Sequence, residues 1–305
     1  MVRPSAAEGQ RTMAAGHSGR ALLEWARASR WPSDNPLPIH VSELQRLASE
    51  WRRQVESQSQ WISDPTRPAA PGEAGGIFVR TPGLSYLGYL KPTKIGGPNE
   101  PRAANEKIVA DLAVDLDVPV PPVLLVRRDP CPSTEESRAC VSLVMHAEVY
   151  EWQHVSALSG VAGALTKVAL ARCSGIVAFD TFVGNTDRNN GRNALFGIDP
   201  EEPADATFVF IDHAFSLNIN DRWSGNRWTD VPLAAMPDHL RNAIDKRILR
   251  DSLDRIEALA DDKIEAIVRR VPDDYMTPAH REVVETGLKA RRSLVRPVVA
   301  GAFGL

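Results

Sequence analysis

The chain has few of the residues that mark disulfide-rich, zinc-binding or membrane proteins. Its cysteines, Cys131, Cys140 and Cys173, are odd in number and form no CxxC pair, so they predict neither a disulfide framework nor a zinc site. No stretch approaches the roughly 18 consecutive apolar residues of a membrane span, and the N-terminal residues lack the apolar core of a signal peptide. We therefore expect a cytoplasmic protein without a membrane partner.

Neither sign of charge predominates, because 36 Lys and Arg stand against 39 Asp and Glu, for a formal net charge of -3. A chain without a global positive field is not expected to bind nucleic acid directly. Lysine is scarce and occurs at only seven positions, so each lysine near a candidate site is informative. The length of 305 residues suits one large domain or a two-lobed one.

Four common catalytic signatures are missing from the sequence. There is no GxxxxGKS/T phosphate loop and no GxGxxG dinucleotide fingerprint. A GxSxG nucleophile elbow and an HExxH zinc motif are absent as well. The Walker-type nucleotide hydrolases, Rossmann enzymes, serine hydrolases of the α/β class and zinc peptidases are therefore disfavoured.

Sequence periodicity divides the chain into an N-terminal extension, a strand-rich part and a helical part. Residues 1 to about 20 are small and polar, helices are predicted at 21–29 and 41–58, and 63–76 form a Pro- and Gly-rich linker. The strand-rich part has predicted strands at 77–80, 85–91, 123–126 and 139–145, with a helix at 102–116. The helical part has predicted helices at 161–182, 237–248, 253–269 and 278–292, with a strand at 208–211. This order suggests two lobes with a cleft between them.

The loop GNTDRNNGRN, at 184–193, gathers more Asn and Asp than a turn needs. Asp187 is its only carboxylate, Arg188 follows directly, and Asn190 and Asn193 offer amide oxygens. A second carboxylate, Asp212, ends the apolar strand predicted at 208–211. Mg²⁺ prefers oxygen ligands, and phosphoryl transfer needs a carboxylate base and a metal clamp. The two segments together therefore predict a phosphoryl-transfer site, whereas each alone is more typical of a surface turn or a helix cap.

A phosphate-binding cation is predicted in the strand-rich part. Lys91 ends a strand and Glu106 lies in the next helix, so a Lys–Glu pair could aim the ammonium at nucleotide phosphates. Lys94 is a rival for the same task. Two structural alternatives stay open, because lysines also protect edge strands from aggregation and Glu106 could be a solvated helix residue.

Several segments, taken in order, resemble those of the HipA-like kinases and, more distantly, the phosphatidylinositol kinases. They are YLGYLKP, NEKIVADLAVDLDVPVPPVLLV, GNTDRNNGRNALF, FIDHAFSL and VRRVPDDYMTPAHREVVETGLKARR, within about 75–295. The resemblance implies a two-lobed, protein-kinase-like α+β fold. Residues 1–75 would form a helical, partly disordered extension and 76–150 a small antiparallel-sheet N-lobe with one helix. Residues 151–305 would form a mainly helical C-lobe that carries the catalytic and metal-binding segments.

The resemblance also implies roles for individual residues. Lys91 would contact the nucleotide phosphates and Glu106 would fix it, while Asp187 would be the catalytic base. Asp212 would bind Mg²⁺. The resemblance assigns no role to Arg188, which by its position next to Asp187 could hold that carboxylate, the adjacent backbone or a phosphate. The turn at 81–83 is only a poor counterpart of the family's phosphate-covering loop.

The second metal ligand departs from the family spacing. The usual Asn follows the catalytic Asp by five positions, where this chain has Arg192. Asn193 would take the role if the loop accommodates one extra residue, and Asn190 is the other candidate.

The implied activity is Mg²⁺-dependent transfer of the ATP γ-phosphate to a hydroxyl, with a protein Ser or Thr favoured. HipA-like kinases include bacterial toxins, so growth control and an antitoxin-type partner protein are further expectations. Two alternatives remain. The shifted Asn would suit a nucleotide-binding pseudokinase that serves as an interaction module, and the DRNN motif would suit a small-molecule or lipid kinase.

Overall fold

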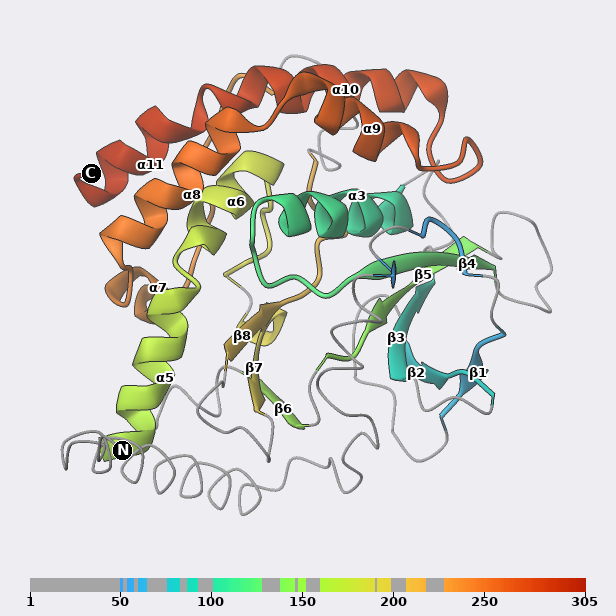
Figure 1. Ribbon diagram of the computed structural model, residues 1–305, viewed down its shortest axis with the longest axis horizontal. Helices are drawn as coiled ribbons and strands as arrows, with labels where there is room; N and C mark the ends of the chain where they lie inside the picture. Colours follow the sequence, from blue (N-terminus) through green and yellow to red (C-terminus); the bar gives the residue numbers. More distant parts are fainter. Residues whose placement is uncertain are drawn as a thin grey trace, which may run out of the picture.

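The computed structural model shows a sheet-rich end and a helix-rich end (Figure 1). It describes residues 50–51, 54–57, 60–64, 76–82, 87–92, 101–127, 138–145, 148–151, 160–189, 191–198, 207–217 and 228–305. The predicted helix at 21–29 and most of that at 41–58 lie outside these residues. So do most of the predicted linker and the candidate residues Lys94 and Asn190.

The sheet-rich end is built on a five-stranded antiparallel sheet with the order β1-β2-β3-β5-β4. Its strands are β1 (Ile62–Ser63), β2 (Ile77–Arg80), β3 (Leu87–Pro92), β4 (Val123–Arg127) and β5 (Arg138–Leu143). The predicted pairing of the strands at 77–80 and 85–91 is confirmed, since Arg80 lies opposite Leu87. Strand β3 places Lys91 opposite Cys140 at the centre of the sheet.

Helix α3 (Arg102–Asp115), which the sequence predicted at 102–116, has no solvated face over most of its length. It packs on β4 and β5 and is covered by α9 (Asp261–Arg269), so that it lies between the sheet and the C-terminal helices (Figure 1). Every residue from 103 to 113 is buried, polar ones included. The alternative that Glu106 is a solvated helix residue is therefore wrong.

The segment 50–64 borders the sheet on both sides. Residues 50–51 are helical, but residues 54–57 are not, so the predicted helix ends before 54 and not at 58. Leu125 of β4 accepts a hydrogen bond from Ser57 N (2.9 Å) and donates one to Val55 O (3.0 Å). At the opposite edge, β1 pairs with β2. The sheet thus includes residues N-terminal to the expected boundary at 76.

The helix-rich end holds a second antiparallel sheet and the remaining helices. Its strands are β6 (Glu148–Glu151), β7 (Ala194–Ile198) and β8 (Thr207–Phe210). The helices are α5 (Gly160–Arg172), α6 (Gly175–Val183), α7 (Asp238–Asn242), α8 (Lys246–Ala258), α10 (Pro278–Arg292) and α11 (Val295–Phe303). The predicted helix at 278–292 is confirmed, whereas β6 and α11 were not predicted.

The long helix predicted at 161–182 is two helices. The Ser174 hydroxyl between them donates to Ala171 O (2.6 Å) and accepts from Asp245 N (2.8 Å), so it fixes a break that the apolar sequence conceals. Asp245 also caps α8 by accepting from the amides of Arg247 and Ile248. The predicted helix end at 248 and the predicted helix start at 253 are both wrong, because α8 runs through both positions.

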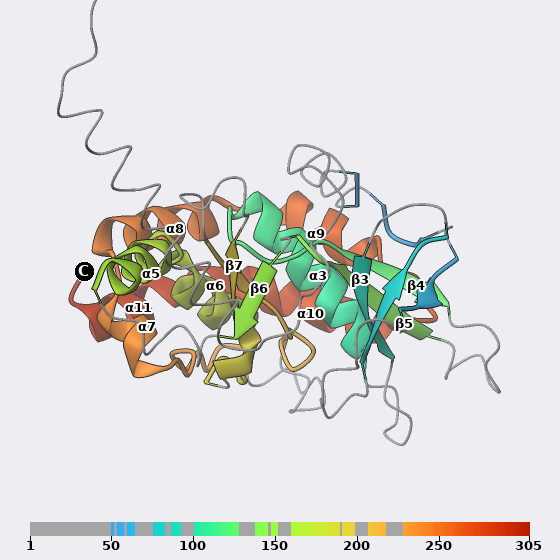
Figure 2. The same cartoon turned by 90° about the horizontal axis from the view of Figure 1, so that it is seen from below.

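The two ends are tied by the turn between α9 and α10. The Tyr275 hydroxyl donates to Val126 O of β4 (2.7 Å), and Arg127 lies over the Tyr275 ring. One apolar core also runs from β4 and α3 into α6, α8, α9 and α10, and Figure 2 shows the sheet and the helices side by side along the long axis. Among the described residues, no helix has the length and apolarity that a bilayer crossing requires.

Candidate active site

The Asn-rich loop starts from a fixed helix end. Helix α6 stops at Gly184, whose left-handed φ of 66° suits a residue without Cβ. The amides of Gly184 and Asn185 both donate to Asp180 O, at 2.8 Å for Asn185. Asn185 Oδ1 then accepts from Asp187 N (3.0 Å). The backbone at Asp187 is therefore set by hydrogen bonds that lead back to α6.

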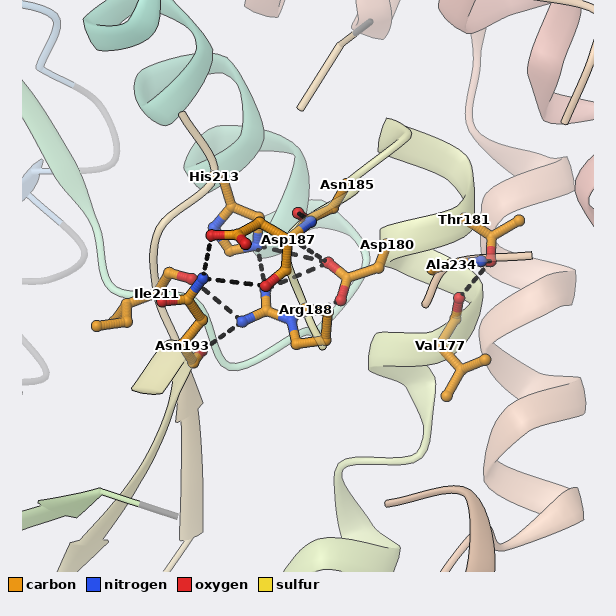
Figure 3. A network of polar contacts seen from close by, with 10 residues as sticks. All are labelled: Val177, Asp180, Thr181, Asn185, Asp187, Arg188, Asn193, Ile211, His213 and Ala234. Carbon is orange, nitrogen blue, oxygen red and sulfur yellow. Dashed lines mark hydrogen bonds and ion pairs between the residues drawn. The ribbon is translucent and has the colours of Figure 1, made fainter. Parts of the chain in front are cut away.

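Beneath the loop lies a buried ion pair between Asp180 and Arg188, both about 1% exposed (Figure 3). Arg188 Nε donates to Asp180 Oδ2 (2.6 Å) and Asn185 Nδ2 donates to Asp180 Oδ1 (3.1 Å). Burial alone would raise the pKa of Asp180, but the Arg188 guanidinium and the nearby His213 imidazole lower it to about 2. Asp180 is consequently ionised at any pH at which the protein would function.

Arg188 connects this ion pair to the strands that carry the other site residues. Its Nη1 donates to the carbonyl oxygens of Asn193 and Ile211, and its Nη2 lies 2.9 Å from His213 Nε2 (Figure 3). Of the roles that the sequence left open for Arg188, its contacts in the described part of the chain support the one to nearby backbone, and none of them reaches the Asp187 carboxylate. The guanidinium lies under the loop because the buried carboxylate of Asp180 holds it there.

Asn193 lies beside Asp187, although its spacing departs from the family pattern. Asn193 Nδ2 donates to Asp187 Oδ2 (2.7 Å) and to Asp187 O (3.1 Å). A short 3₁₀ turn at Gly191–Asn193 accommodates the extra residue. With its Nδ2 directed at Asp187, the oxygen of the amide is the atom left for a ligand. Asn190 is not among the described residues, so its candidacy is untested.

The strand ends bring Asn193 close to Asp212. Asn193 O accepts from Ile211 N (3.1 Å), directly before Asp212. Strands β7 and β8 pair with Ala194 opposite Phe210. Asn193, just before Ala194, and Asp212, just after Ile211, therefore lie at the same end of this strand pair. The sequence motifs thus meet through Asn193, which contacts Asp187 by its side chain and Ile211 by its backbone.

Lys91 joins the sheet to the helical end. Its Nζ donates to Glu106 Oε1 (2.6 Å) and to Asp212 Oδ1 (3.0 Å). Burial alone would lower the pKa of Lys91, but the two carboxylates outweigh it and raise the pKa. The ammonium in turn keeps the pKa of Asp212 below its usual value, against the effect of burial. Three residues that the sequence analysis singled out therefore form one charged cluster.

The donor set fits a hard cation and a phosphate. Asp212 is one third exposed at its side chain, and Asp187 is half-buried. With the Asn193 amide they offer only oxygen ligands, which Mg²⁺ prefers. The Lys91 ammonium supplies positive charge at the same place for a phosphate oxygen.

Sequence reasoning missed two residues that organise the site. Asp180 could have been found, because it is the only charged residue of the otherwise apolar helix GIVAFDTFV. Asn105, in α3, donates from Nδ2 to Ala214 O (3.1 Å) and Ser216 O (2.9 Å) after Asp212. It carries no comparable signal, since it follows Ala104 in an ordinary helical stretch.

Comparisons with known proteins identify a family and a fold. A family model described as HipA-like kinase matches residues 93–296, more than half of the chain. The fold is similar to a crystal structure of the Helicobacter pylori proinflammatory kinase CtkA, with a TM-score of 0.58 and 17% identity. The match covers 81% of this chain and 97% of that one, and it confirms the expected two-lobed, kinase-like fold. No curated protein matches the sequence.

Proposed function

Because the chain belongs to the HipA-like kinase family, we propose that it transfers the γ-phosphate of ATP to a hydroxyl group in a Mg²⁺-dependent reaction. The acceptor that we favour is a protein Ser or Thr. The observation that carries the proposal is the contact of Lys91 with both Glu106 and Asp212, because it supports pairing a cation suited to phosphate with a carboxylate suited to metal. We further propose 76–150 as the nucleotide-binding lobe and 151–305 as the catalytic lobe.

In this proposal, Lys91 and Asp212 would exchange their mutual contact for contacts to phosphate and metal. Glu106 is buried and would keep the ammonium in place meanwhile. Asn193 would add its amide oxygen to the metal site, oriented by the bond from its Nδ2 to Asp187. Bound Mg²⁺ would neutralise charge on the phosphates, as it does generally in phosphoryl transfer.

Asp187 would accept the proton of the acceptor hydroxyl. As the hydroxyl oxygen bonds to the γ-phosphorus, the bond from that phosphorus to the β,γ-bridging oxygen breaks, and ADP leaves. Asn193 Nδ2 and the Asn185–Asp187 backbone bond would hold the carboxylate for this transfer. Such alignment matters because phosphoryl transfer depends mainly on positioning and electrostatic stabilisation.

Asp187→Asn tests the proposal, because it keeps the shape and removes the base. We expect the transfer of ³²P from ATP to fall by about 10²- to 10⁴-fold while the affinity for ATP stays near the wild-type value. Asp117→Asn is the matched control, since Asp117 is exposed and its ion pair in the described part of the chain is with Arg255 at the surface. Unchanged transfer in Asp187→Asn would show that Asp187 is not the base.

The same assay separates the two alternative functions. A pseudokinase would bind ATP and give no labelled product with the wild-type chain, and the Asn193 geometry argues against it. A small-molecule or lipid kinase would place the label in metabolites or lipids and never in protein. Growth control and an antitoxin-type partner rest on family membership alone. Growth of cells that express the wild-type chain or Asp187→Asn would test that part.

A further inference from the structure

The segment that follows β8 has an unusual backbone. Asp212 has a φ of 62° and Leu217 a φ of 59°, both left-handed without being glycine. Such conformations are costly for residues with a Cβ and persist only when the surroundings enforce them. The contacts that enforce this one therefore also determine where the Asp212 carboxylate points.

Contacts on both sides of Asp212 hold the segment. Before it, Ile211 is bound through its amide to Asn193 O and through its carbonyl to Arg188. After it, Leu217 N donates to Val183 O (2.7 Å). These bonds belong to the helix-rich end, and none of them reaches the helix that carries Glu106.

Asn105 supplies the hydrogen bonds of the missing connection to α3, and Arg102 of the same helix adds a contact by lying over the Phe215 ring, 4.6 Å from its centroid. It is fully buried in α3, and its single Nδ2 donates to Ala214 O and Ser216 O, within four residues of Asp212. Its Oδ1 is buried and has no hydrogen-bond partner in the described part of the chain. A buried oxygen without a hydrogen-bond partner lowers the stability of the fold. The two bonds from Nδ2 therefore have to contribute more stability than the unpaired Oδ1 costs.

The neighbour of Asn105 binds the other half of the charged cluster. Successive helical residues point about 100° apart, so Glu106 reaches Lys91 on β3 while Asn105 reaches the segment after Asp212. One turn of α3 thus fixes the ammonium and the carboxylate relative to each other. This arrangement would set how well a metal-bound nucleotide fits between them.

We propose that Asn105 is a positioning residue that holds Asp212 in its left-handed conformation and thereby sets the affinity for metal-bound nucleotide. The inference rests on the proposed function, because it assigns Asp212 to the metal. In this role Asn105 would touch neither metal nor nucleotide, because its Nδ2 is bound to Ala214 O and Ser216 O. It acts on the carbonyl oxygens that follow Asp212, in the way that outer residues of metal sites orient the ligands.

Two variants test this role. Asn105→Asp has the same size but turns an oxygen toward the two carbonyl oxygens, and Asn105→Leu removes the Nδ2 donor together with the unpaired oxygen. The affinity of a non-hydrolysable ATP analogue is measured by calorimetry with Mg²⁺ and with EDTA. The wild-type chain should bind more tightly with Mg²⁺. Both variants should lose about tenfold or more of the affinity with Mg²⁺ and little of that with EDTA.

Thr181→Val is the matched control. Thr181 is buried in α6, where its Oγ1 donates to Val177 O and accepts from Ala234 N, far from α3 in the chain. This variant should lower the melting temperature and leave unchanged the gain in affinity for the ATP analogue that Mg²⁺ produces. It separates a loss of stability from a loss of positioning.

The outcomes distinguish failure of the inference from failure of the proposed function. If the wild-type chain shows no gain with Mg²⁺, the proposed function is wrong. If the wild-type chain shows the gain and both Asn105 variants retain it, the inference is wrong. An equal loss with Mg²⁺ and with EDTA would also overturn it, because that result would mean that Asn105 only stabilises the fold. Should Asn105→Asp fail to fold, Asn105→Leu decides.

Discussion

Lys91 of β3 and Lys107 of α3 are both withdrawn from water, yet their pKa values are displaced in opposite directions. Lys91 has two carboxylates within 3.0 Å, from Glu106 and Asp212, and their attraction overcomes the cost of burial and raises its pKa. Lys107 is fully buried and has one carboxylate, Asp111, at 2.9 Å. Burial prevails there and lowers the pKa of Lys107, and it raises that of Asp111.

The difference lies in what each lysine holds. Lys91 brings together side chains from both lobes, and Asp212 remains partly open to solvent, as a binding site requires. The ammonium of Lys107 donates to Gln54 O (2.6 Å), which fixes the N-terminal segment to α3, and the Lys107 side chain is closed off from solvent. The cluster around Lys91 is arranged so that its charged groups can exchange partners for a ligand. The pair of Lys107 and Asp111 stabilises the fold.

The largest effect is expected at Lys107. Lys107→Met removes the hydrogen-bonded partner of the buried Asp111 carboxylate, which keeps only the more distant Arg270 Nη1 (3.6 Å) among the described residues, and it leaves Gln54 O without its donor. Loss of one member of a buried pair costs about 3–5 kcal/mol, which urea unfolding at pH 7 would measure. Molecules that remain folded should bind nucleotide almost as the wild-type chain does.

A double variant checks the cause of that loss. Lys107→Met with Asp111→Leu replaces the pair by apolar groups, and such replacements are often neutral or stabilising. It should recover most of the lost free energy of unfolding. If the free energy of unfolding of Lys107→Met lies within about 1 kcal/mol of the wild-type value, then Lys107 does not hold the N-terminal segment to α3.

A smaller effect, on rate and not on folding, is expected at Lys91. In Lys91→Arg the charge is retained, but a planar guanidinium cannot take the place of a compact ammonium between Glu106 and Asp212. Phosphoryl transfer should fall about 10²-fold, or roughly 2.7 kcal/mol, as for loss of one preorganised donor.

The free energy of unfolding of Lys91→Arg should change by less than about 1 kcal/mol. Lys167→Arg makes the same exchange at an exposed lysine of α5 and should leave both quantities unaltered. Wild-type transfer by Lys91→Arg would mean that the Lys91 cluster does not bind the nucleotide.

The smallest effect is a pH dependence that has opposite signs for the two clusters. The folded-state pKa of Asp111 lies above its ordinary 3.8, so its contribution to stability falls as pH rises through that window. The pKa of Lys107 lies below its ordinary 10.5, so stability rises again as pH approaches 10.5. Compared with the double variant at 107 and 111, the wild-type chain should be relatively least stable near neutral pH.

Urea unfolding of both chains from pH 4 to 10 measures this difference. Lys91 and Asp212 have pKa values displaced the other way, so an ion pair of their kind would give a maximum near neutral pH. A maximum in the measured difference would therefore show that Lys107 and Asp111 attract each other as strongly as the residues around Lys91 do.

Sequence patterns were sufficient where the cause of the structure is local. Alternating apolar residues located β2 and β3, and the apolar spacing of 278–292 located α10. The chemistry of phosphoryl transfer, with the family resemblance, singled out Lys91, Glu106 and Asp212, which the fold then brings together.

Features that depend on distant partners could not be predicted. The helix break at Ser174 requires Asp245, 71 residues away, and the burial of Lys107 requires a backbone carbonyl at Gln54. A sequence does not reveal which backbone carbonyl oxygens will need a hydrogen-bond donor. Nothing in it therefore distinguished Lys107 from a solvated lysine. The burial of Arg188 could not be predicted either, because it depends on the Asp180 carboxylate in α6 and not on the loop that contains Arg188.

The segment at 55–57 lies along β4, and strand β1 pairs with β2, so residues before Gly76 cover both sides of the rest of the larger sheet. A chain shortened to begin at Gly76 would present the backbone of β2 and β4 as open edges, and open edges pair with other molecules. Such a chain would be prone to self-association even with every catalytic side chain intact. Insolubility of a trimmed form would thus reflect an uncovered sheet and say nothing about the chemistry.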